Sequence, residues 1–418
     1  MKKLIVVTSY PEEGMIHGKK TVGVASYAKN TLIALSKAGK DKPKITVLAE
    51  KLPGQKDKYQ EDNVQVIRCW QRNTWSAYWQ IGRKIKKLKA KKVMIEFEMA
   101  MFGSPFKNVF FPLFLIWLKL INKKSIVVIH QVVLDFSQLS GHLGAKKDNL
   151  KTKALSLTGK IFFKSILITA NQIVVFEQFL KNRLAKLGNV NKIKVIPHGV
   201  EKIDIRTTKK EARNKLDIPQ SKYVLSIFGY LAWYKGSDWL VKAVSQHLER
   251  SKNDNLYLIL SGGPNPNHVG KDFYDKYIQN IEKTAKKHSK NIKIAGFIPE
   301  NEINLYYQAA DLMIFPYRTG MSSSGPLALA FTNHKPFLVS KPLAPLLKTE
   351  DIKSTLAQLD ISSDEITFSL SNDDFISKLT QLQNKPNLSD KLTQAARLIT
   401  EKRSWQNIGN IYHQELFE

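Results

Sequence analysis

A basic residue, a serine-rich turn and a histidine stand where they could act on a phosphorylated ligand. Arg318 precedes the run Ser322-Ser-Ser-Gly325, which predicts the start of a helix. The free N–H groups and the positive dipole end of a helix start favour a diphosphate, and Arg318 adds positive charge beside it. His130 follows an apolar run and so ends a predicted strand, where an imidazole can donate to a hydroxyl or a developing charge. A structural histidine is the alternative.

Two widespread phosphate-binding motifs are absent from the sequence. Gly270-Lys271 is followed by Asp272, and the position five before Gly270 is Asn265, so the glycine and the hydroxyl of a P-loop are both missing. No Gly-x-Gly-x-x-Gly follows the first predicted strand either. A dinucleotide-dependent oxidoreductase is therefore disfavoured.

The elements that must position these residues alternate along the chain. Short β-branched runs are followed by longer helical patterns, which predicts an α/β fold with parallel sheets built from βαβ units. This alternation of strand and helix patterns is interrupted at Val195–Val200 and in the charged stretch that follows, and then resumes. The predicted strands are Leu4–Thr8, Ile45–Ala49, Val64–Cys69, Val93–Phe97, Ile126–His130, Ile173–Phe176, Ile193–Ile196, Val224–Phe228, Leu256–Ser261, Ile292–Ala295, Leu312–Phe315 and Phe337–Val339.

This rhythm predicts two Rossmann-like, doubly wound domains that face each other across a cleft. The 418 residues suit two domains, because single cores stop growing beyond about 250–300 residues. We expect the first domain over residues 1–200, the second over 201–395 and a closing helix over 396–418. Ligands of such sheets bind at the carboxyl ends of the strands.

The composition is that of a globular chain, with 43% hydrophobic and 24% charged residues. A single cysteine, Cys69, cannot form an internal disulfide, so a reducing cytoplasm is the simpler location. The N-terminal apolar run is too short for a signal peptide and predicts a strand. The longest apolar stretch, Val109–Ile121, is interrupted by Pro112 and Lys119 and is too short to span a bilayer. We predict a buried core helix there, in preference to an interfacial membrane helix.

The net charge of +29 comes from 65 Lys and Arg against 36 Asp and Glu. Such an excess indicates nucleic acid, anionic lipid or a phosphorylated substrate as partner, or else a solvated surface. No zinc-finger spacing, RNP-type motif or helix-turn-helix signature is found, which argues against nucleic acid. A cluster within helical patterns suits a surface that faces a membrane, and it comprises Lys84, Lys86, Lys87, Lys89, Lys91 and Lys92.

Several segments resemble family 4 of the retaining GT-B glycosyltransferases, and the likeness covers nearly the whole chain. Phe228–Asp238 is similar to the family's segment after the first strand of the second domain. Ala310–Phe331, followed by Lys335-Pro336, is similar to its donor-binding segment. The remaining segments are Thr21–Tyr27, Glu96–Gly103, Val127–Gln131, Ser261–Pro264, Ile294–Glu300 and the tail Arg403–Tyr412.

The resemblance implies a nucleotide-sugar site in the second domain. Lys235 would neutralise the leaving diphosphate, while Tyr230 stands where the family has an arginine. The two glutamates of the family are replaced by Met321 and Leu329, which departs from the pattern. The implied donor-binding residues are Gly23, Gly229, Tyr230, Lys235, Phe297, Arg318, Ser322, Ser323, Ser324, Gly325 and Pro326.

On the acceptor side the resemblance implies Glu98 and His130, with His130, Lys235 and Arg318 as the catalytic residues. The implied reaction moves a hexose from a nucleotide-diphosphate sugar to a glycan or lipid-linked acceptor, with retention and without cofactor or metal. We expect a role in polysaccharide biosynthesis, in the cytoplasm, with peripheral attachment at an anionic membrane surface. Two alternatives stay open, which are a catalytically inactive GT-B subunit that acts as a binding partner or scaffold, and a nucleic-acid-binding protein.

Overall fold

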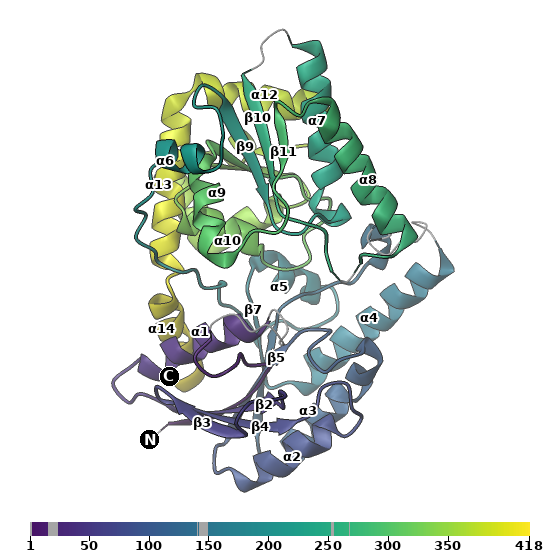
Figure 1. The fold of residues 1–418 in the computed structure, drawn as a ribbon. Coiled ribbons are helices and arrows are strands. Elements are labelled where there is room, and N and C mark those ends of the chain that lie inside the picture. Colours follow the sequence, from purple (N-terminus) through teal and green to yellow (C-terminus); the bar gives the residue numbers. More distant parts are fainter. Residues whose placement is uncertain (1, 16–23, 140, 142–148, 252–254, 267) are drawn as a thin grey trace.

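The chain folds into two α/β domains, with the first domain at the bottom of Figure 1 and the second at the top. The computed structural model describes residues 2–15, 24–139, 141, 149–251, 255–266 and 268–418. The C-terminal end of the chain returns to the first domain and lies near the N-terminus (Figure 1). The predicted α/β fold with two parallel-sheet domains is confirmed.

The first domain contains an eight-stranded sheet in the order β3-β4-β2-β1-β5-β6-β7-β8. All neighbouring strands are parallel except β3 and β4. Its central strands β1, β5 and β6 are buried after their first residue, as expected for a sheet covered on both faces. The strands are β1 (Lys3–Val7), β2 (Lys44–Glu50), β3 (Lys58–Glu61), β4 (Val64–Trp70), β5 (Lys92–Phe97), β6 (Lys124–Ile129), β7 (Gln172–Val175) and β8 (Ile193–Val195).

The helices of the first domain are α1 (Val24–Lys37), α2 (Ala77–Lys87), α3 (Phe111–Leu120), α4 (Leu150–Thr169) and α5 (Gln178–Ala185). Two 3₁₀ turns, η1 (Pro105–Phe110) and η2 (Phe136–Leu139), follow the carboxyl ends of β5 and β6.

The second domain contains a six-stranded parallel sheet in the order β11-β10-β9-β12-β13-β14. The strands are β9 (Tyr223–Phe228), β10 (Leu256–Ser261), β11 (Ile292–Ile294), β12 (Leu312–Phe315), β13 (Phe337–Ser340) and β14 (Thr367–Phe368). The helices are α6 (Lys209–Lys215), α7 (Ser237–Arg250), α8 (Asp272–Lys287), α9 (Ile303–Ala309), α10 (Gly325–Thr332), α11 (Glu350–Gln358), α12 (Asn372–Asn384) and α13 (Pro386–Lys402). The 3₁₀ turns are η3 (Trp233–Lys235), η4 (Glu300–Glu302), η5 (Ala344–Lys348) and η6 (Ser363–Glu365).

Both sheets have the same strand order once the hairpin strand β3 and the additional edge strand β8 of the first sheet are set aside. In each, the chain moves outward from its first strand, returns to the other side of that strand and continues outward. The order reverses between β1 and β5 in the first domain and between β9 and β12 in the second. Ligands of open α/β sheets bind at such reversals, outside the carboxyl ends of the strands.

The C-terminal segment joins the two domains. α13 packs on α10 and α11 of the second domain, whereas α14 (Trp405–Phe417) packs on α1 of the first. The chain therefore crosses at Arg403–Ser404, and residue 396, the expected start of the closing helix, lies within α13. A β-carbon on Gly199 would overlap the ring of Trp405, so the tryptophan lies directly on the first domain's end of the connection.

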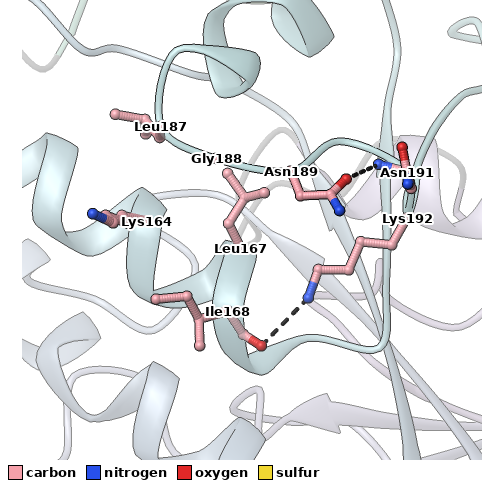
Figure 2. Close-up of a pocket in the computed structure, with 8 residues that line it drawn as sticks. All are labelled: Lys164, Leu167, Ile168, Leu187, Gly188, Asn189, Asn191 and Lys192. Carbon is pink, nitrogen blue, oxygen red and sulfur yellow. Dashed lines mark hydrogen bonds between the residues drawn. The ribbon is translucent and has the colours of Figure 1, made fainter.

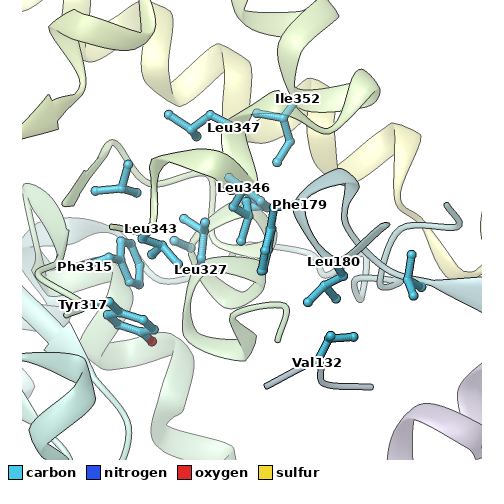
Figure 3. Close-up of a cluster of buried hydrophobic side chains, with 14 of the residues drawn as sticks. Val132, Phe179, Leu180, Phe315, Tyr317, Leu327, Leu343, Leu346, Leu347 and Ile352 are labelled. Carbon is cyan, nitrogen blue, oxygen red and sulfur yellow. The ribbon is translucent and has the colours of Figure 1, made fainter. Parts of the chain in front are cut away.

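An apolar cluster continues from one domain into the other. Phe179 and Leu180 of α5 and Val132 after β6 face Leu343 and Leu346 at η5 (Figure 3). All of these side chains are buried. The two domains are therefore held together by a hydrophobic contact in addition to the chain crossings.

The prediction of a buried helix at Val109–Ile121 is wrong in one respect. Its residues form the end of η1 and α3, and only one side of α3 is buried, at Phe111, Phe114, Leu115 and Leu118. Leu113 and Ile116 are exposed, as is Leu120. No helix among the described residues has the length and apolar character needed to cross a bilayer.

Candidate active site

The strand ends of the second domain converge through glycines. Gly229 follows β9 with a φ of 100°, a conformation that favours glycine. A β-carbon on Gly262, after β10, would overlap the carbonyl oxygen of Gly229. One on Gly263 would lie 3.1 Å from the backbone nitrogen of Phe297, after β11. Side chains are thus excluded where three strand ends meet, which leaves backbone at the surface of the site.

Lys235 directs its ammonium group to this point. A β-carbon on Gly229 would lie 2.6 Å from Nζ of Lys235 and 3.4 Å from Cγ of Pro326, so both lie beside the same glycine. Lys235 is 8% exposed, and burial lowers its pKa to about 8. Within the described part of the chain, no carboxylate forms an ion pair with it. The site therefore holds a buried cation whose charge is not balanced.

The turn at the start of α10 lies next to this cation. Ser324 caps the helix, because its hydroxyl accepts a hydrogen bond from the N–H of Leu327, and it also contacts the hydroxyl of Tyr317 at 3.0 Å. Pro326 has no N–H group. A β-carbon on Gly325 would meet no atom within 4 Å, so the first turn of the helix opens onto free space there. An anion at this helix start would meet Gly325 backbone and Lys235.

Arg318 forms an internal ion pair. Its two Nη atoms lie 2.7 and 2.8 Å from the carboxylate oxygens of Asp238, in the first turn of α7. Nη1 also donates to the carbonyl of Trp233 at 2.5 Å, and the guanidinium lies 4.8 Å from the centre of that ring. In a bidentate pair of this kind the carboxylate balances the positive charge of the guanidinium. Its assignment as a diphosphate ligand stays a prediction, and the contacts seen here are structural.

The remaining residues of the expected donor site differ in their exposure to solvent. Tyr230 and Phe297 are exposed at the rim, 43% and 74% respectively. Met321 and Leu329, which occupy the positions of the two family glutamates, are partly buried and bring no charge. Gly23 lies outside the described residues.

Ser322 and Ser323 lie against the first domain. Ser322 forms an isolated antiparallel bridge with Gln131, and the N–H of Val132 donates to the carbonyl of Met321 at 3.2 Å. The hydroxyl of Ser323 donates to Oε1 of Glu177 at 2.8 Å. The loop after β12 therefore connects the donor side of the second domain to the carboxyl ends of β6 and β7.

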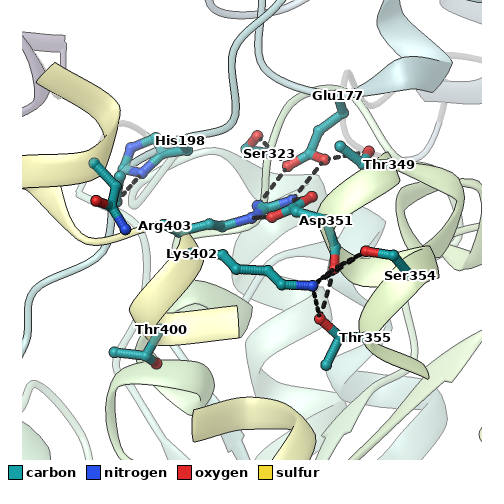
Figure 4. Close-up of polar contacts among 12 residues, drawn as sticks. Glu177, His198, Ser323, Thr349, Asp351, Ser354, Thr355, Thr400, Lys402 and Arg403 are labelled. Atoms are coloured by element: carbon teal, nitrogen blue, oxygen red, sulfur yellow. Dashed lines mark hydrogen bonds and ion pairs between the residues drawn. The ribbon is translucent and has the colours of Figure 1, made fainter. Parts of the chain in front are cut away.

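Glu177 is the centre of a buried polar cluster between the domains (Figure 4). It follows β7, is completely buried and accepts a hydrogen bond from Thr349 at 2.6 Å. Nη1 and Nη2 of Arg403 lie 3.1 and 3.3 Å from its two oxygens, and Arg403 also binds Asp351. The two carboxylates raise the pKa of Arg403 above its usual value. Sequence reasoning missed Glu177, although its place directly after a predicted strand was a usable signal.

On the opposite side of the cleft, His130 and Glu96 form a buried pair. Nε2 of His130 lies 2.8 Å from Oε2 of Glu96, in the neighbouring strand β5. Burial lowers the pKa of His130 to about 3, so the imidazole is neutral at pH 7, and burial raises the pKa of Glu96 well above its usual range. Oε1 of Glu96 has no hydrogen-bond partner among the described residues. His130 can thus offer a hydrogen bond to a hydroxyl, but it does not carry a charge at neutral pH.

Other polar groups lie at the same edge of the first sheet. Glu98 lies in the loop after β5, and burial raises its pKa. Arg72, which sequence reasoning missed, donates to Oε1 of Glu50 at 2.7 Å and to Ser9 at 3.2 Å. Glu50 is buried at the carboxyl end of β2, and burial raises its pKa as well. Carboxyl groups and one guanidinium therefore gather at the carboxyl edge of the first sheet.

Two further features of the structure are a cavity in the first domain and the arrangement of side chains that can bind metals. A cavity of about 360 Å³ lies between α4 and the loop before β8, lined by Lys164, Ile168 and Asn191 among others (Figure 2). It lies at the amino end of the sheet, and Lys192 is already bound to the carbonyl of Ala170. Among the described residues, no group of three or more His, Cys, Asp or Glu is arranged to hold a metal ion.

Residues 222–347 match the family described as glycosyl transferases group 1. The match lies within the second domain and runs from the start of β9 to η5. The matched range contains Lys235, Arg318 and the whole turn from Ser322 to Pro326, so the convergent strand ends belong to the part that carries the family pattern.

Individual proteins resemble the chain as well. D-inositol 3-phosphate glycosyltransferase of Corynebacterium glutamicum is 30% identical over 105 residues, which are 25% of this chain and 24% of that protein. The alignment thus spans about a quarter of the length of this curated relative. Sucrose-phosphate synthase from Thermosynechococcus elongatus aligns over 99% of this chain and 98% of its own, at 15% identity with a TM-score of 0.67. HepE of Anabaena, in complex with UDP, aligns over 100% and 99%, at 13% identity with a TM-score of 0.63.

These structural alignments show the fold of the whole chain. The two domains together have the GT-B fold, which consists of two Rossmann-like domains. The carboxyl ends of β6 and β7 in the first domain contact the loop after β12 in the second, so the two sets of polar residues described above belong to adjoining parts of the two domains.

Proposed function

We propose that the chain is a glycosyltransferase that moves a hexose from a nucleotide-diphosphate sugar to a glycan or lipid-linked acceptor, with retention of configuration and without a metal. The observation that supports this proposal is the buried ammonium group of Lys235, whose positive charge is not balanced by a carboxylate of the described residues and which lies beside the start of α10. A buried cation costs free energy unless a ligand compensates it. A diphosphate is a compensating ligand that also fits a helix start.

The proposed reaction is a front-face displacement. An acceptor hydroxyl forms a bond to the anomeric carbon while the bond from that carbon to the diphosphate oxygen breaks. The leaving diphosphate oxygen takes the proton of the acceptor hydroxyl. Lys235 and the N–H of Gly325 stabilise the negative charge that develops on the diphosphate, which is the role that preorganised donors have in other transfer reactions.

The first domain supplies the acceptor side in this proposal. The neutral His130 donates a hydrogen bond to a sugar hydroxyl, and Glu98 accepts one from the acceptor. Ser323 links the donor turn to Glu177, so the distance between the two sides is set by a buried cluster. The uridine nucleotide is the first donor to test, because the HepE structure contains UDP.

A catalytically inactive GT-B subunit is the second candidate function. It is favoured by Met321 and Leu329, which bring no carboxylate, and by the engagement of Arg318 with Asp238. Such a subunit would bind a nucleotide sugar without turning it over.

The test combines binding and turnover on the purified chain. Calorimetry with UDP-, GDP- and ADP-glucose identifies the donor, and release of the nucleoside diphosphate is then followed with and without EDTA. NMR of the anomeric proton of the product reports retention or inversion. Turnover that survives EDTA supports the proposal, whereas tight binding with no hydrolysis or transfer to a panel of acceptors assigns the inactive role.

Lys235→Ala is the informative variant, and we expect its turnover to fall by orders of magnitude. Lys293→Ala is a matched control, because Lys293 lies in the same domain and binds the carbonyl of Leu216 away from the site. Equal activity of Lys235→Ala and the wild type would remove Lys235 from the mechanism.

A further inference from the structure

The first domain exposes a continuous apolar surface on α2, η1 and α3, which we call the aromatic face. Trp75 and Trp79 are each 62% exposed, and Phe106 is 82% exposed. α3 adds a row of aliphatic side chains that point away from the core, at Leu113, Ile116 and Leu120. Large exposed apolar surfaces are uncommon on soluble monomers and mark sites of interaction.

The aromatic face is shaped by the contact between two helices. Gly82 of α2 lies close to α3, since a β-carbon there would be 3.2 Å from the ring of Trp117. A groove of about 550 Å³ runs between the helices, with Tyr78, Phe114 and Trp117 among its lining residues. Both helices lie at the outer end of the first domain, away from the second domain (Figure 1).

Cationic side chains surround and cover these rings. The guanidinium of Arg83 lies 4.6 Å from the ring centre of Trp79, and Nζ of Lys107 lies 5.4 Å from that of Trp75. Nζ of Lys86 lies 5.8 Å from the ring centre of Trp117. Residues 63–95 and 99–134 contain no Asp or Glu, so no acidic side chain from these segments offsets the charge.

We propose that the aromatic face docks the protein on the surface of an anionic lipid bilayer. Tryptophan rings favour the interface between headgroups and acyl chains, where the aliphatic row of α3 reaches the acyl boundary. Lysine and arginine side chains extend from such a surface to the phosphates, and each contributes about 1 kcal/mol near an anionic membrane. The combination of aliphatic, aromatic and cationic side chains on one face fits this partner.

Two other occupants fit less well. A second copy of the chain would bring two basic faces together, and like charges repel at such an interface. Nucleic acid would pair with the cations and could stack on the rings, but it gives no reason for the exposed aliphatic row of α3.

The aromatic face is connected to the cleft. Asn108 in η1 donates to the carbonyl of Met99 at 2.8 Å, and Met99 follows Glu98 in the loop after β5. The docked surface would thus lie next to the acceptor side. The statement that docking presents a lipid-linked acceptor rests on the proposed function, whereas docking itself does not.

The experiment measures binding to vesicles in the absence of any nucleotide sugar. The full chain is sedimented with vesicles of phosphatidylcholine alone or with 30 mol% phosphatidylglycerol. We expect binding to the anionic vesicles that weakens with salt, and a loss of about tenfold in Trp79→Ser. A triple variant of Arg83, Lys86 and Lys107 to Gln, which removes the cations over the rings, should lose about fivefold per cation.

A triple variant of Lys283, Lys286 and Lys287 to Gln on α8 is the matched control, because it removes the same charge from the second domain. Equal losses in both triple variants would reduce the effect to net charge and overturn the proposal. So would absence of binding to anionic vesicles, tight RNA binding without vesicle binding, or a dimer in sedimentation that Trp79→Ser dissolves. Nucleotide affinity, measured in parallel, reports on the proposed function separately, because none of these residues lies near Lys235.

Discussion

Lys235→Met should make the protein more stable and less able to bind a nucleotide. The pKa of Lys235 falls from 10.5 to about 8 because burial disfavours the ammonium. Below pH 8 the lysine is protonated in both the folded and the unfolded chain, so the folded chain bears the full cost of the buried charge. Between pH 8 and 10.5 the unfolded chain binds more protons than the folded one, and stability therefore rises with pH.

The size of the effect follows from the shift in pKa. A shift of this size corresponds to about 3 kcal/mol at pH 7, at about 1.4 kcal/mol for each pH unit. Methionine removes the charge and keeps most of the apolar stem. Since each kcal/mol moves the Tm of a domain of this size by about 2–4 °C, we expect a rise of several degrees at pH 7 that vanishes above pH 10.

Thermal unfolding of the ligand-free protein between pH 7 and 10.5 measures this gain, and calorimetry with UDP measures the loss of affinity. We expect UDP to bind about ten- to a hundredfold more weakly, because a charge-assisted hydrogen bond contributes about 1.5–3 kcal/mol. Lys335→Met is the matched control. Burial also lowers the pKa of Lys335 to about 8, but its Nζ binds the carbonyls of Gln308 and Ala310. A Lys235→Met protein that is less stable and binds UDP normally would refute the reasoning.

Three further substitutions test other parts of the site. Glu177→Gln removes one of the two carboxylates that bind Arg403. We expect the free energy of unfolding, measured by denaturant titration, to fall by about 3–5 kcal/mol. A change below about 1 kcal/mol would contradict a structural role for this ion pair. Gly262→Ala places a β-carbon on the carbonyl oxygen of Gly229, so both the stability of the protein and its affinity for UDP should decrease. An unchanged UDP affinity would show that the loop after β9 does not contact the nucleotide. Arg318→Lys loses the bidentate pair, and we expect about 1–2 kcal/mol less stability with UDP affinity within threefold of the wild type. A hundredfold loss of UDP affinity in the Arg318→Lys protein would show that Arg318 binds the diphosphate.

The strands were predictable from sequence where they are buried on both faces. Runs such as Leu256–Ser261 consist of apolar residues with a clear start and end, and the structure has the same bounds. β3 escaped prediction because Lys58–Glu61 is polar and pairs in an antiparallel manner at the sheet edge. β14 contains only two residues and has no pattern of its own.

The candidate site was predictable only where one local segment contains the signal. Lys235 and the turn before α10 each follow a strand closely, so their position at the sheet edge could be inferred. The partner of Arg318 lies 80 residues away in the sequence, and that of Glu177 lies 226 residues away. Pairings over such separations depend on tertiary structure, which local spacing does not encode.

The aromatic face shows a related limit. α3 is apolar around most of its circumference, so composition predicts burial without indicating which residues face the core. The structure resolves this by packing one side of the helix on the sheet and leaving the other exposed.

The two chain segments that connect the domains are paired with each other. Val200, on the way into the second domain, forms a parallel bridge with Ser404, on the way back, and its N–H donates to the carbonyl of Arg403 at 2.8 Å. The two segments are thereby tied together at one point, so that any displacement of one domain relative to the other has to carry both of them along.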